Sequence, residues 1–260
     1  MSNLLVLDAT NLAHRLLHGV SDRDPVEVFG FTIERYRKAY DPSYAVACFD
    51  PIHDSSSWRR ELWPEYKAAS AVRTEAVGRL LCAAQAECRA AGLAVAEVPG
   101  LEADDLIGAY TEAAVAEGWP VTILSSDKDM GQLVRVDPPV RLVREVPRPQ
   151  VWDPSTVRER FGVEPERLPD VLALAGDRSD GIPGVPGIGV KTAAKLLAEQ
   201  GPTLERLLDR KALIRSRRML DLLTAHEAEI EIYLQLARLR TGDPLPVPLD
   251  GCRWRRPGGV

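Results

Sequence analysis

The chain has 260 residues, of which 45% are hydrophobic and 27% charged, and these proportions are typical of a soluble globular protein of one or two domains. No apolar run approaches the length of a membrane span, and no basic segment precedes the first apolar stretch, so we expect neither a membrane anchor nor a secretory signal. The four cysteines show no CxxC spacing, which argues against zinc and favours free thiols in a reducing cytoplasm.

The net charge of −5 argues at face value against a polyanionic partner. Nine of the acidic residues belong to one predicted cluster, described below, and without them the net charge is +4. A protein that concentrates acid at a metal site can still present a basic face elsewhere. The net charge therefore excludes no class of partner.

Four apolar runs, at residues 4–7, 45–49, 94–98 and 121–124, are typical of buried parallel strands. Helical patterns lie between them, at residues 26–40, 75–91 and 103–117. This alternation predicts an α/β domain over residues 1–150, with a mostly parallel central sheet flanked by helices. A further strand is predicted at residues 141–146, ahead of a proline-rich link, PRPQVWDP.

The rest of the chain reads as a second, helical part over residues 151–241. A Gly/Pro cluster at residues 177–189 interrupts it. The final segment, residues 242–260, is rich in proline, glycine and arginine, and we predict that it is a flexible tail.

Acidic residues follow the predicted strands at the points where the strands end. Because ligands bind beyond the carboxyl ends of the strands in an open parallel sheet, we expect these side chains to converge. Two further acids in the Gly/Pro cluster could reach the same edge. The complete set is Asp8, Asp50, Glu102, Asp104, Asp105, Asp127, Asp129, Asp177 and Asp180.

Any one of these acids, taken alone, is equally well explained as a helix cap or a first-turn charge. The set is harder to explain in that way, because carboxylates packed together repel one another and multivalent cations relieve the repulsion. Ligands that are all oxygen atoms suit Mg²⁺ or Mn²⁺. Two such ions can activate a water and stabilise the leaving oxygen of a phosphodiester.

The run PGVPGIG leads into a helix that begins near Val190 or Lys191. Glycines let backbone N–H groups approach a phosphate, and the helix N-terminus adds a favourable dipole. A plain corner between two helices is the alternative. The candidate phosphate-binding residues are Gly187, Ile188, Gly189, Val190, Lys191 and Thr192.

The segment after Asp50, PIHDSSSWRRELWPEYKAASAVRTE, interleaves basic and aromatic residues. Cations beside stacking rings suit a single strand or a frayed end of a duplex. The alternative is a solvated loop whose aromatic side chains belong to the core. The basic residues are Arg59, Arg60, Lys67 and Arg73, and they lie near Trp58, Trp63 and Tyr66.

Together these motifs resemble those of the 5′ nuclease superfamily, which includes the nuclease domain of bacterial DNA polymerase I, phage 5′ exonucleases and flap endonucleases. The resemblance extends from LLVLDATNL to about residue 240 and includes CFD, LEADDLIG, SSDKDMGQL and LAGDRSDGIPGVPGIGVKTA. It implies a PIN-like nuclease domain with a helical arch at about residues 51–75 and a helix–two-turn–helix at residues 174–200. We expect a free-standing protein, because the sequence ends where a polymerase-fused member would continue.

The resemblance implies Mg²⁺- or Mn²⁺-dependent hydrolysis of DNA by two metals, as a 5′-3′ exonuclease and flap endonuclease in replication or repair. One metal would be held by Asp8, Asp50, Glu102 and Asp104, with Asp105 beside them, and the other by Asp127, Asp129, Asp177 and Asp180. Tyr66 and Lys67 of the arch would meet the scissile nucleotide, and Arg59 would lie at the base of the arch. Duplex DNA would bind around a K⁺ held by the backbone carbonyls of Leu174, Ala175, Pro183, Val185 and Ile188.

One departure from the family pattern is Ser70, which stands where the family often has an arginine three residues after the arch lysine. Arg73 is the candidate substitute. We expect a monomer in the cytoplasm that acts on 5′ flaps and branched or nicked duplexes, on an RNA–DNA hybrid as well, and with a DNA polymerase acting in trans. The alternatives are a metal-dependent ribonuclease and a non-catalytic DNA-junction binding protein, and the latter predicts losses among the nine acids that the sequence does not show.

Overall fold

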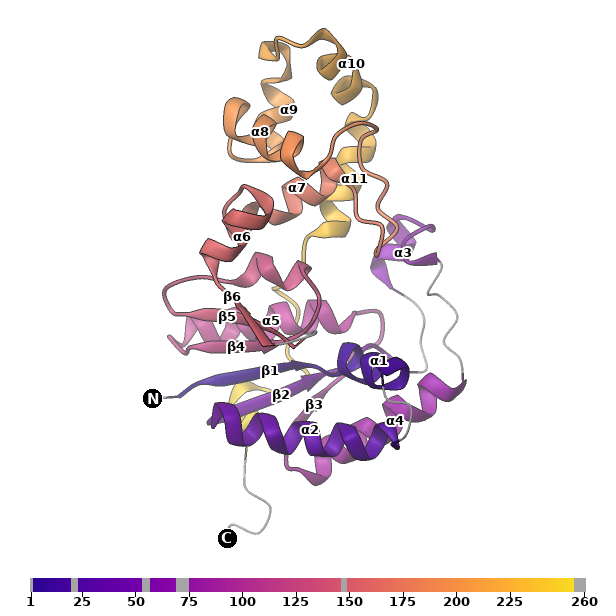
Figure 1. The fold of residues 1–260 in the computed structure, drawn as a ribbon, viewed down its shortest axis with the longest axis vertical. Coiled ribbons are helices and arrows are strands. Elements are labelled where there is room, and N and C mark those ends of the chain that lie inside the picture. The colour runs from indigo at the N-terminus through magenta and orange to yellow at the C-terminus, as the bar shows by residue number, and fades with distance from the viewer. Residues whose placement is uncertain (1, 20–22, 53–56, 69–74, 146–148, 255–260) are drawn as a thin grey trace.

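The computed structural model describes residues 2–19, 23–52, 57–68, 75–145 and 149–254 (Figure 1). Its centre is a six-stranded sheet with the strand order β3-β2-β1-β4-β5-β6, in which every neighbouring pair is parallel except β5 and β6. The strands are β1 (Leu4–Asp8), β2 (Tyr44–Cys48), β3 (Ala94–Ala96), β4 (Val121–Leu124), β5 (Val140–Glu145) and β6 (Pro149–Trp152).

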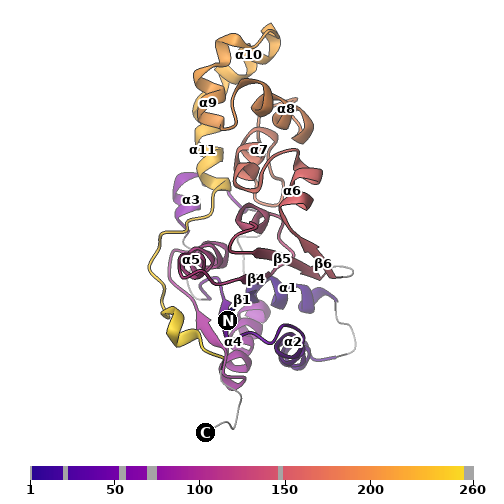
Figure 2. The same ribbon diagram turned by 90° about the vertical axis from the view of Figure 1, so that its left-hand side faces the viewer.

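Helices cover both faces of the sheet and then form a separate body above it (Figures 1 and 2). Short 3-10 turns lie at η2 (Asp129–Leu133), η3 (Pro165–Arg167), η4 (Lys211–Leu213) and η5 (Leu249–Cys252). The α-helices are α1 (Ala9–Gly19), α2 (Pro25–Tyr40), α3 (Trp58–Leu62), α4 (Glu75–Ala90), α5 (Ala103–Ala116), α6 (Pro154–Phe161), α7 (Leu168–Ala175), α8 (Val190–Gln200), α9 (Leu204–Asp209), α10 (Arg217–Ala225) and α11 (Glu227–Ala237).

The alternation of side chains along β1 builds the two faces of the sheet domain. Leu4 and Val6 pack with α5 and the η2 turn, whereas Leu5 and Leu7 pack with α1, α2 and α4. Both faces are buried, because crossover helices cover each side of a parallel sheet. This explains why the strands read as continuous apolar runs in the sequence.

The helical domain has a core of its own, formed by α7, α8, α9 and α11 with contributions from α10. Tyr66, from the segment that follows α3, is a member of this core and has only 1% of its surface exposed. The stretch from α3 to Tyr66 therefore packs against the helical domain and links it to the sheet domain.

The C-terminal segment returns to the sheet domain after α11 and runs past α5 (Figure 2). The hydroxyl of Tyr110 donates a hydrogen bond to the Val247 carbonyl at 2.7 Å, Cys252 is buried, and the Trp254 indole donates to the Ala91 carbonyl at 2.8 Å. A Cβ on Gly108 of α5 would lie 3.1 Å from Thr241, so glycine allows the segment to pass this close. The predicted flexible tail is thus wrong for residues 242–254, whose apolar side chains join the core, and residues 255–260 lie outside the described residues.

The α/β fold class with a helical C-terminal part is confirmed, and two elements were not predicted from the sequence. Helix α1 begins directly after β1, where Asp8 caps it by accepting a hydrogen bond from the Asn11 amide at 3.0 Å. Strand β6 lies within the predicted proline-rich link; its first residue, Pro149, is tolerated because β6 is an edge strand. Among the described residues, no helix is both long and apolar enough to cross a membrane.

The buried Asp170 of α7 gives a test of the helical core. Only 1% of it is exposed, and its carboxylate lies 3.6 Å from Arg167 and 3.6 Å from Arg238. Burial raises the pKa of Asp170 to about 6, although Arg238 and Arg167 oppose this. The folded state therefore holds the proton more tightly than the unfolded state, and this contribution is complete below about pH 4 and is lost as the pH rises through 6.

We expect Asp170→Asn to become more stable relative to the wild type between pH 4 and pH 7, by up to about 3 kcal/mol, because asparagine cannot ionise. Urea unfolding of both proteins at a series of pH values measures this difference. Asp209→Asn, at an exposed position of α9, is the matched control. Its difference in stability from the wild type should stay constant as the pH changes. A constant difference for Asp170→Asn as well would contradict the prediction.

Candidate active site

The register of the parallel strands brings carboxylates to one edge of the sheet. Asp8 lies opposite Cys48, and Leu7 lies opposite Leu124, so the residues that follow β1, β2 and β4 emerge side by side. Asp50 turns its carboxylate to the first turn of α5, where it accepts a hydrogen bond from the Ala103 amide at 2.7 Å. The sequence prediction of a convergent acidic edge agrees with this arrangement.

A second group of acids, Asp177 and Asp180, reaches the same place from the helical domain. One carboxylate oxygen from each of them and one from Asp129, which begins the η2 turn after β4, lie within 4.8 Å of one another, and all three side chains are buried. Asp177 and Ile182 exchange two backbone hydrogen bonds of 2.8 Å, which hold the loop that carries Asp177 and Asp180. This set of oxygen ligands has the chemistry that a divalent cation such as Mg²⁺ or Mn²⁺ prefers.

Two lysines supply positive charge among these acids. Lys67 Nζ lies 2.8 Å from Glu102 and 3.7 Å from both Asp104 and Asp180, so it joins the two groups of carboxylates. Lys128 Nζ contacts Asp177 and lies 3.5 Å from Asp129. Both lysines thus lie where their positive charge offsets the repulsion between the carboxylates.

Burial and mutual repulsion disfavour the ionised form of several of these acids. Burial raises the pKa of Asp8 to about 7, and the neighbouring Asp50 and Asp127 add to the rise. Burial also raises the pKa of Asp104 and Asp129, with Asp127 the next cause in Asp129. Such shifts mark a site that gains from an added cation.

Glu102 shows the opposite shift. Burial alone would raise the pKa of Glu102, but the charges of Lys67 and Arg59 outweigh it and lower the pKa to about 2. Hydrogen bonds from Lys67 at 2.8 Å and from the Ser57 hydroxyl at 2.7 Å act in the same direction. Glu102 therefore stays ionised and ready to act as a ligand.

Asp105 does not belong to this cluster, contrary to the sequence prediction. Both of its oxygens are engaged by Arg59, at 2.7 and 2.8 Å, and they also accept hydrogen bonds from the Trp58 indole and the Arg240 amide, each at 3.0 Å. Glu102 is the N-cap of α5, whereas Asp105 lies inside the helix and is buried. Asp105 is therefore a structural partner of Arg59.

Tyr66, which the family resemblance placed at the scissile nucleotide, and Arg59, which it placed at the base of the arch, are both buried. Arg59 is 2% exposed and donates hydrogen bonds to the carbonyls of Leu236 at 2.9 Å and Arg238 at 3.1 Å, which ties α3 to the end of α11. Tyr66 presents only its hydroxyl, 3.2 Å from Glu102 and 3.3 Å from Asp180. The buried ring cannot stack on a nucleotide, so both residues position the site. Arg73 and Ser70 lie outside the described residues.

Hydroxyl and amide side chains that were not predicted hold the acids in place. The Ser125 hydroxyl donates to Asp8 at 2.6 Å, and the Thr10 hydroxyl accepts a hydrogen bond from the Asp50 amide at 2.9 Å. Asn11 accepts from the Ser126 hydroxyl at 2.6 Å. The signal for these residues was their place beside the acids, in the runs DATN and SSDKD.

The Gly/Pro turn is built by close contact of two backbone segments. A Cβ on Gly176 would lie 2.5 Å from the Pro183 carbonyl, and a Cβ on Gly184 would lie 2.3 Å from the Gly176 nitrogen, so both positions require glycine. Helix α8 then begins at Val190 without a side-chain cap, and Lys191 is exposed beside its first turn. No N-cap side chain therefore accepts a hydrogen bond from the first backbone N–H groups of α8.

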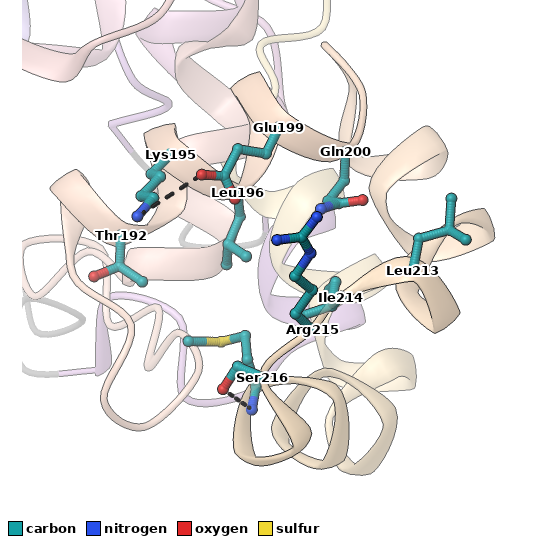
Figure 3. Close-up of a pocket in the computed structure, with 10 residues that line it drawn as sticks. Thr192, Lys195, Leu196, Glu199, Gln200, Leu213, Ile214, Arg215 and Ser216 are labelled. Carbon is teal, nitrogen blue, oxygen red and sulfur yellow. Dashed lines mark hydrogen bonds and ion pairs between the residues drawn. The ribbon is translucent and has the colours of Figure 1, made fainter.

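A hollow of about 530 Å³ lies beside this turn, between α8 and the segment that leads into α10 (Figure 3). Of the residues predicted for phosphate binding only Thr192 lines it, and Lys195 at its rim is paired with Glu199 at 3.7 Å. None of the clustered carboxylates lines this hollow, so it is separate from the acidic site.

The sheet, the acidic edge and the helical domain together define a metal-dependent nuclease fold. Residues 3–162 match the family model "5′-3′ exonuclease, N-terminal resolvase-like domain", and residues 163–258 match "5′-3′ exonuclease, C-terminal SAM fold". The chain therefore belongs to the 5′-3′ exonuclease family, a family of nucleases that includes flap endonucleases.

Relatives of two lengths are similar to the chain. It is 37% identical over 260 residues to the thermostable DNA polymerase I of Thermus filiformis, of which it spans 30%, with 98% of the chain covered. It is 34% identical to flap endonuclease Xni of Yersinia enterocolitica, with 98% of the chain and 99% of that relative covered. A structure of the phage T5 5′-exonuclease with bound divalent zinc ions has a TM-score of 0.80 at 26% identity, over 92% of this chain and 90% of that one.

The acidic cluster should bind a divalent cation and be stabilised by it. We expect Asp129→Asn to raise the melting temperature in a chelator, because it removes a buried charge that its neighbours repel. Mg²⁺ or Mn²⁺ should stabilise the wild type by about 2.7 kcal/mol at a hundred times its Kd, and the variant by clearly less at the same concentration. Thermal unfolding with and without metal measures both effects.

Asp221→Asn, which removes an exposed carboxylate of α10 that pairs with Arg217, is the matched control and should respond to metal as the wild type does. An Asp129→Asn variant that gains as much stability from metal as the wild type would place the cation elsewhere.

Proposed function

We propose that the chain is a divalent-metal-dependent, structure-specific 5′ nuclease that hydrolyses phosphodiester bonds in DNA, as a 5′-3′ exonuclease and flap endonuclease. The observation that carries the proposal is the meeting of two carboxylate groups, one from the strand ends and one from the helical domain, around Lys67. Related proteins support the substrate, since a phage T5 flap endonuclease with a TM-score of 0.78 and 26% identity was solved in complex with DNA and metal ions.

The residues divide into two ligand sets. Asp8, Asp50, Glu102 and Asp104 would hold one Mg²⁺ or Mn²⁺ ion, and Asp127, Asp129, Asp177 and Asp180 would hold another. Bound cations of this kind supply an activated water and stabilise the charge of the leaving oxygen. The chain itself orients the ligands, through the hydrogen bonds that Ser125 and Ser57 donate to Asp8 and Glu102.

Lys67 is the residue of the arch that we assign to the reacting phosphate. Its side chain is partly exposed and its Nζ lies among the carboxylates, so it can leave Glu102 for a phosphate oxygen when cations take over the charge balance. Arg73 is proposed to take the place of the arginine that Ser70 replaces. Arg59 and Tyr66 act through their contacts with Asp105 and Glu102.

Duplex DNA is proposed to bind at the Gly/Pro turn, through the backbone of residues 187–192 and the charge of Lys191. A K⁺ ion held by the carbonyls of Leu174, Ala175, Pro183, Val185 and Ile188 would organise this turn. The direct backbone contact between Gly176 and Gly184 supports the assignment, because it brings the two carbonyl-bearing segments together. We further propose that the protein acts as a monomer, on RNA–DNA hybrids as well as DNA, and together with a DNA polymerase acting in trans.

Cleavage of a 5′-labelled flap substrate tests the proposed activity. We expect cleavage near the junction with Mg²⁺ or Mn²⁺ and none with a chelator. Asp127→Asn should reduce the single-turnover rate by orders of magnitude while the protein stays folded, because a ligand charge is lost with little change of shape. Metal-independent cleavage, or an unaffected variant in saturating Mg²⁺, would overturn the two-metal assignment.

The Gly/Pro turn should contribute to duplex affinity and not to chemistry. Gly187 has a φ of 81°, so Gly187→Asn and Gly187→Asp strain the backbone alike and differ only in charge. We expect Gly187→Asp to bind a flap duplex roughly three- to tenfold more weakly than Gly187→Asn, because its charge meets a phosphate, with similar rates at saturating DNA. Equal affinities, measured by fluorescence anisotropy, would place the duplex elsewhere.

Lys67→Ala should lower the single-turnover rate by roughly ten- to a thousandfold, the range that one lost electrostatic contact in an active site usually costs. DNA affinity should change far less, because many phosphate contacts remain. Lys67→Arg keeps the charge and should recover part of the rate. A variant that loses affinity alone would show that Lys67 clamps the substrate and takes no part in the reaction.

A further inference from the structure

Two arginines near the β6 edge of the sheet pack against the same aromatic ring. The guanidinium carbons of Arg144, on β5, and Arg160, on α6, lie 4.7 and 4.8 Å from the ring centroid of Trp152. Trp152 ends β6 and is buried, so its ring is a fixed platform. The site lies at the β6 edge of the sheet, where the chain crosses into the helical domain (Figures 1 and 2).

Arg144 is held at the border of the acidic cluster. Its Nε and Nη2 donate hydrogen bonds to the Ser126 carbonyl, at 2.9 and 2.5 Å. Ser126 immediately precedes Asp127, one of the clustered acids, and Arg144 follows Val143, which lies opposite Leu124 in the register of β4 and β5. A ligand on Arg144 would therefore lie next to the proposed cleavage site.

In the part of the chain that the structure describes, the two guanidinium groups form no ion pair. Within the described residues, neither Arg144 nor Arg160 has a carboxylate oxygen within 4.0 Å, whereas Arg158 on the same helix pairs with Glu164 at 2.8 Å. Arg160 makes only a 3.4 Å hydrogen bond to the Gln150 side chain. Partial burial lowers the pKa of Arg144, the charge of the nearby Asp127 opposes this, and the charge of Arg160 adds to the lowering. Two like charges held together are stabilised by an anion.

We propose that Arg144 and Arg160 form a second phosphate-binding site, which takes a backbone phosphate of the nucleic acid beside the acidic cluster. Guanidinium groups bind phosphate oxygens through paired N–H donors and can stack on an aromatic ring at the same time, which suits this arrangement. The ligand is a phosphate and not a base, because the buried ring of Trp152 leaves no face for stacking. The inference rests on the proposed function and extends the path of the DNA to the β6 edge.

This site differs in place from the other two proposed contacts. The arch segment approaches the acids from α3, and the Gly/Pro turn belongs to the helical domain beside α8, whereas Arg144 and Arg160 come from β5 and α6. The strand would be held by phosphate contacts at more than one border of the acidic cluster. Such contacts fix the register of the DNA without reading its sequence.

The test compares two variants of α6 that remove the same charge. Arg160→Ala removes the unpaired arginine, and Arg158→Ala, the matched control, removes the one that pairs with Glu164. We expect Arg160→Ala to weaken binding of a 5′-flap duplex in chelator by roughly three- to tenfold and to reduce the slope of log Kd against log salt by about 0.9, the value for one lost phosphate contact. Arg158→Ala should change neither, and Arg160→Lys should recover part of the affinity.

Neutral methylphosphonate linkages, placed one at a time in the flap duplex, then locate the contact. At one position within a few nucleotides of the cleaved bond, the wild type should lose affinity and Arg160→Ala should lose none. Equal losses for both proteins at every position, or equal effects of Arg158→Ala and Arg160→Ala, would overturn the inference. A wild type that neither binds nor cuts the substrate would instead refute the proposed function, so the two failures are distinct.

Discussion

The repulsion between carboxylates at one edge of the sheet is the constraint on which the structure depends. The parallel register forces Asp8 and the acids after β2 and β4 together, and the loop with Asp177 and Asp180 adds more from the helical domain. Burial makes this repulsion stronger, as the raised pKa of Asp8 shows. The lysines in the cluster offset part of this repulsion. A site arranged in this way is most stable, and chemically active, when cations are bound.

The acids stay in place because a buried ion pair fastens the arch segment to both domains. Arg59 binds Asp105 on α5 and the carbonyls at the end of α11, while Ser57 and Lys67, on either side of it in the chain, reach Glu102. Removing one partner of such a pair leaves a buried charge uncompensated, which is usually strongly destabilising. The stretch around Arg59 is thus part of the folded core, and the charge of Arg59 holds α3 against α5 and the end of α11.

The sequence was sufficient for those features that depend on local periodicity. Apolar runs located β1 to β4, and the shared direction of parallel strands put the acids that follow them at a common edge. It could not separate Asp104 from Asp105, which are adjacent, because the choice depends on an arginine 46 residues away in the chain. It also could not show that the ring of Tyr66 is buried, because the core that covers it is formed by helices more than a hundred residues later.

The return of the chain to the sheet domain after α11 has a mechanical consequence. The helical domain is connected to the sheet domain twice, once between β6 and α6 and once through residues 238–242, and the second connection is secured where the following segment packs on α5. The stretch from Arg59 to Lys67 packs on both domains as well, and the Lys67 amide donates a hydrogen bond to the Asp180 carbonyl at 2.9 Å. A body held at three separated places resists both swinging and twisting, so the loop with Asp177 and Asp180 keeps a fixed distance from the strand-end acids.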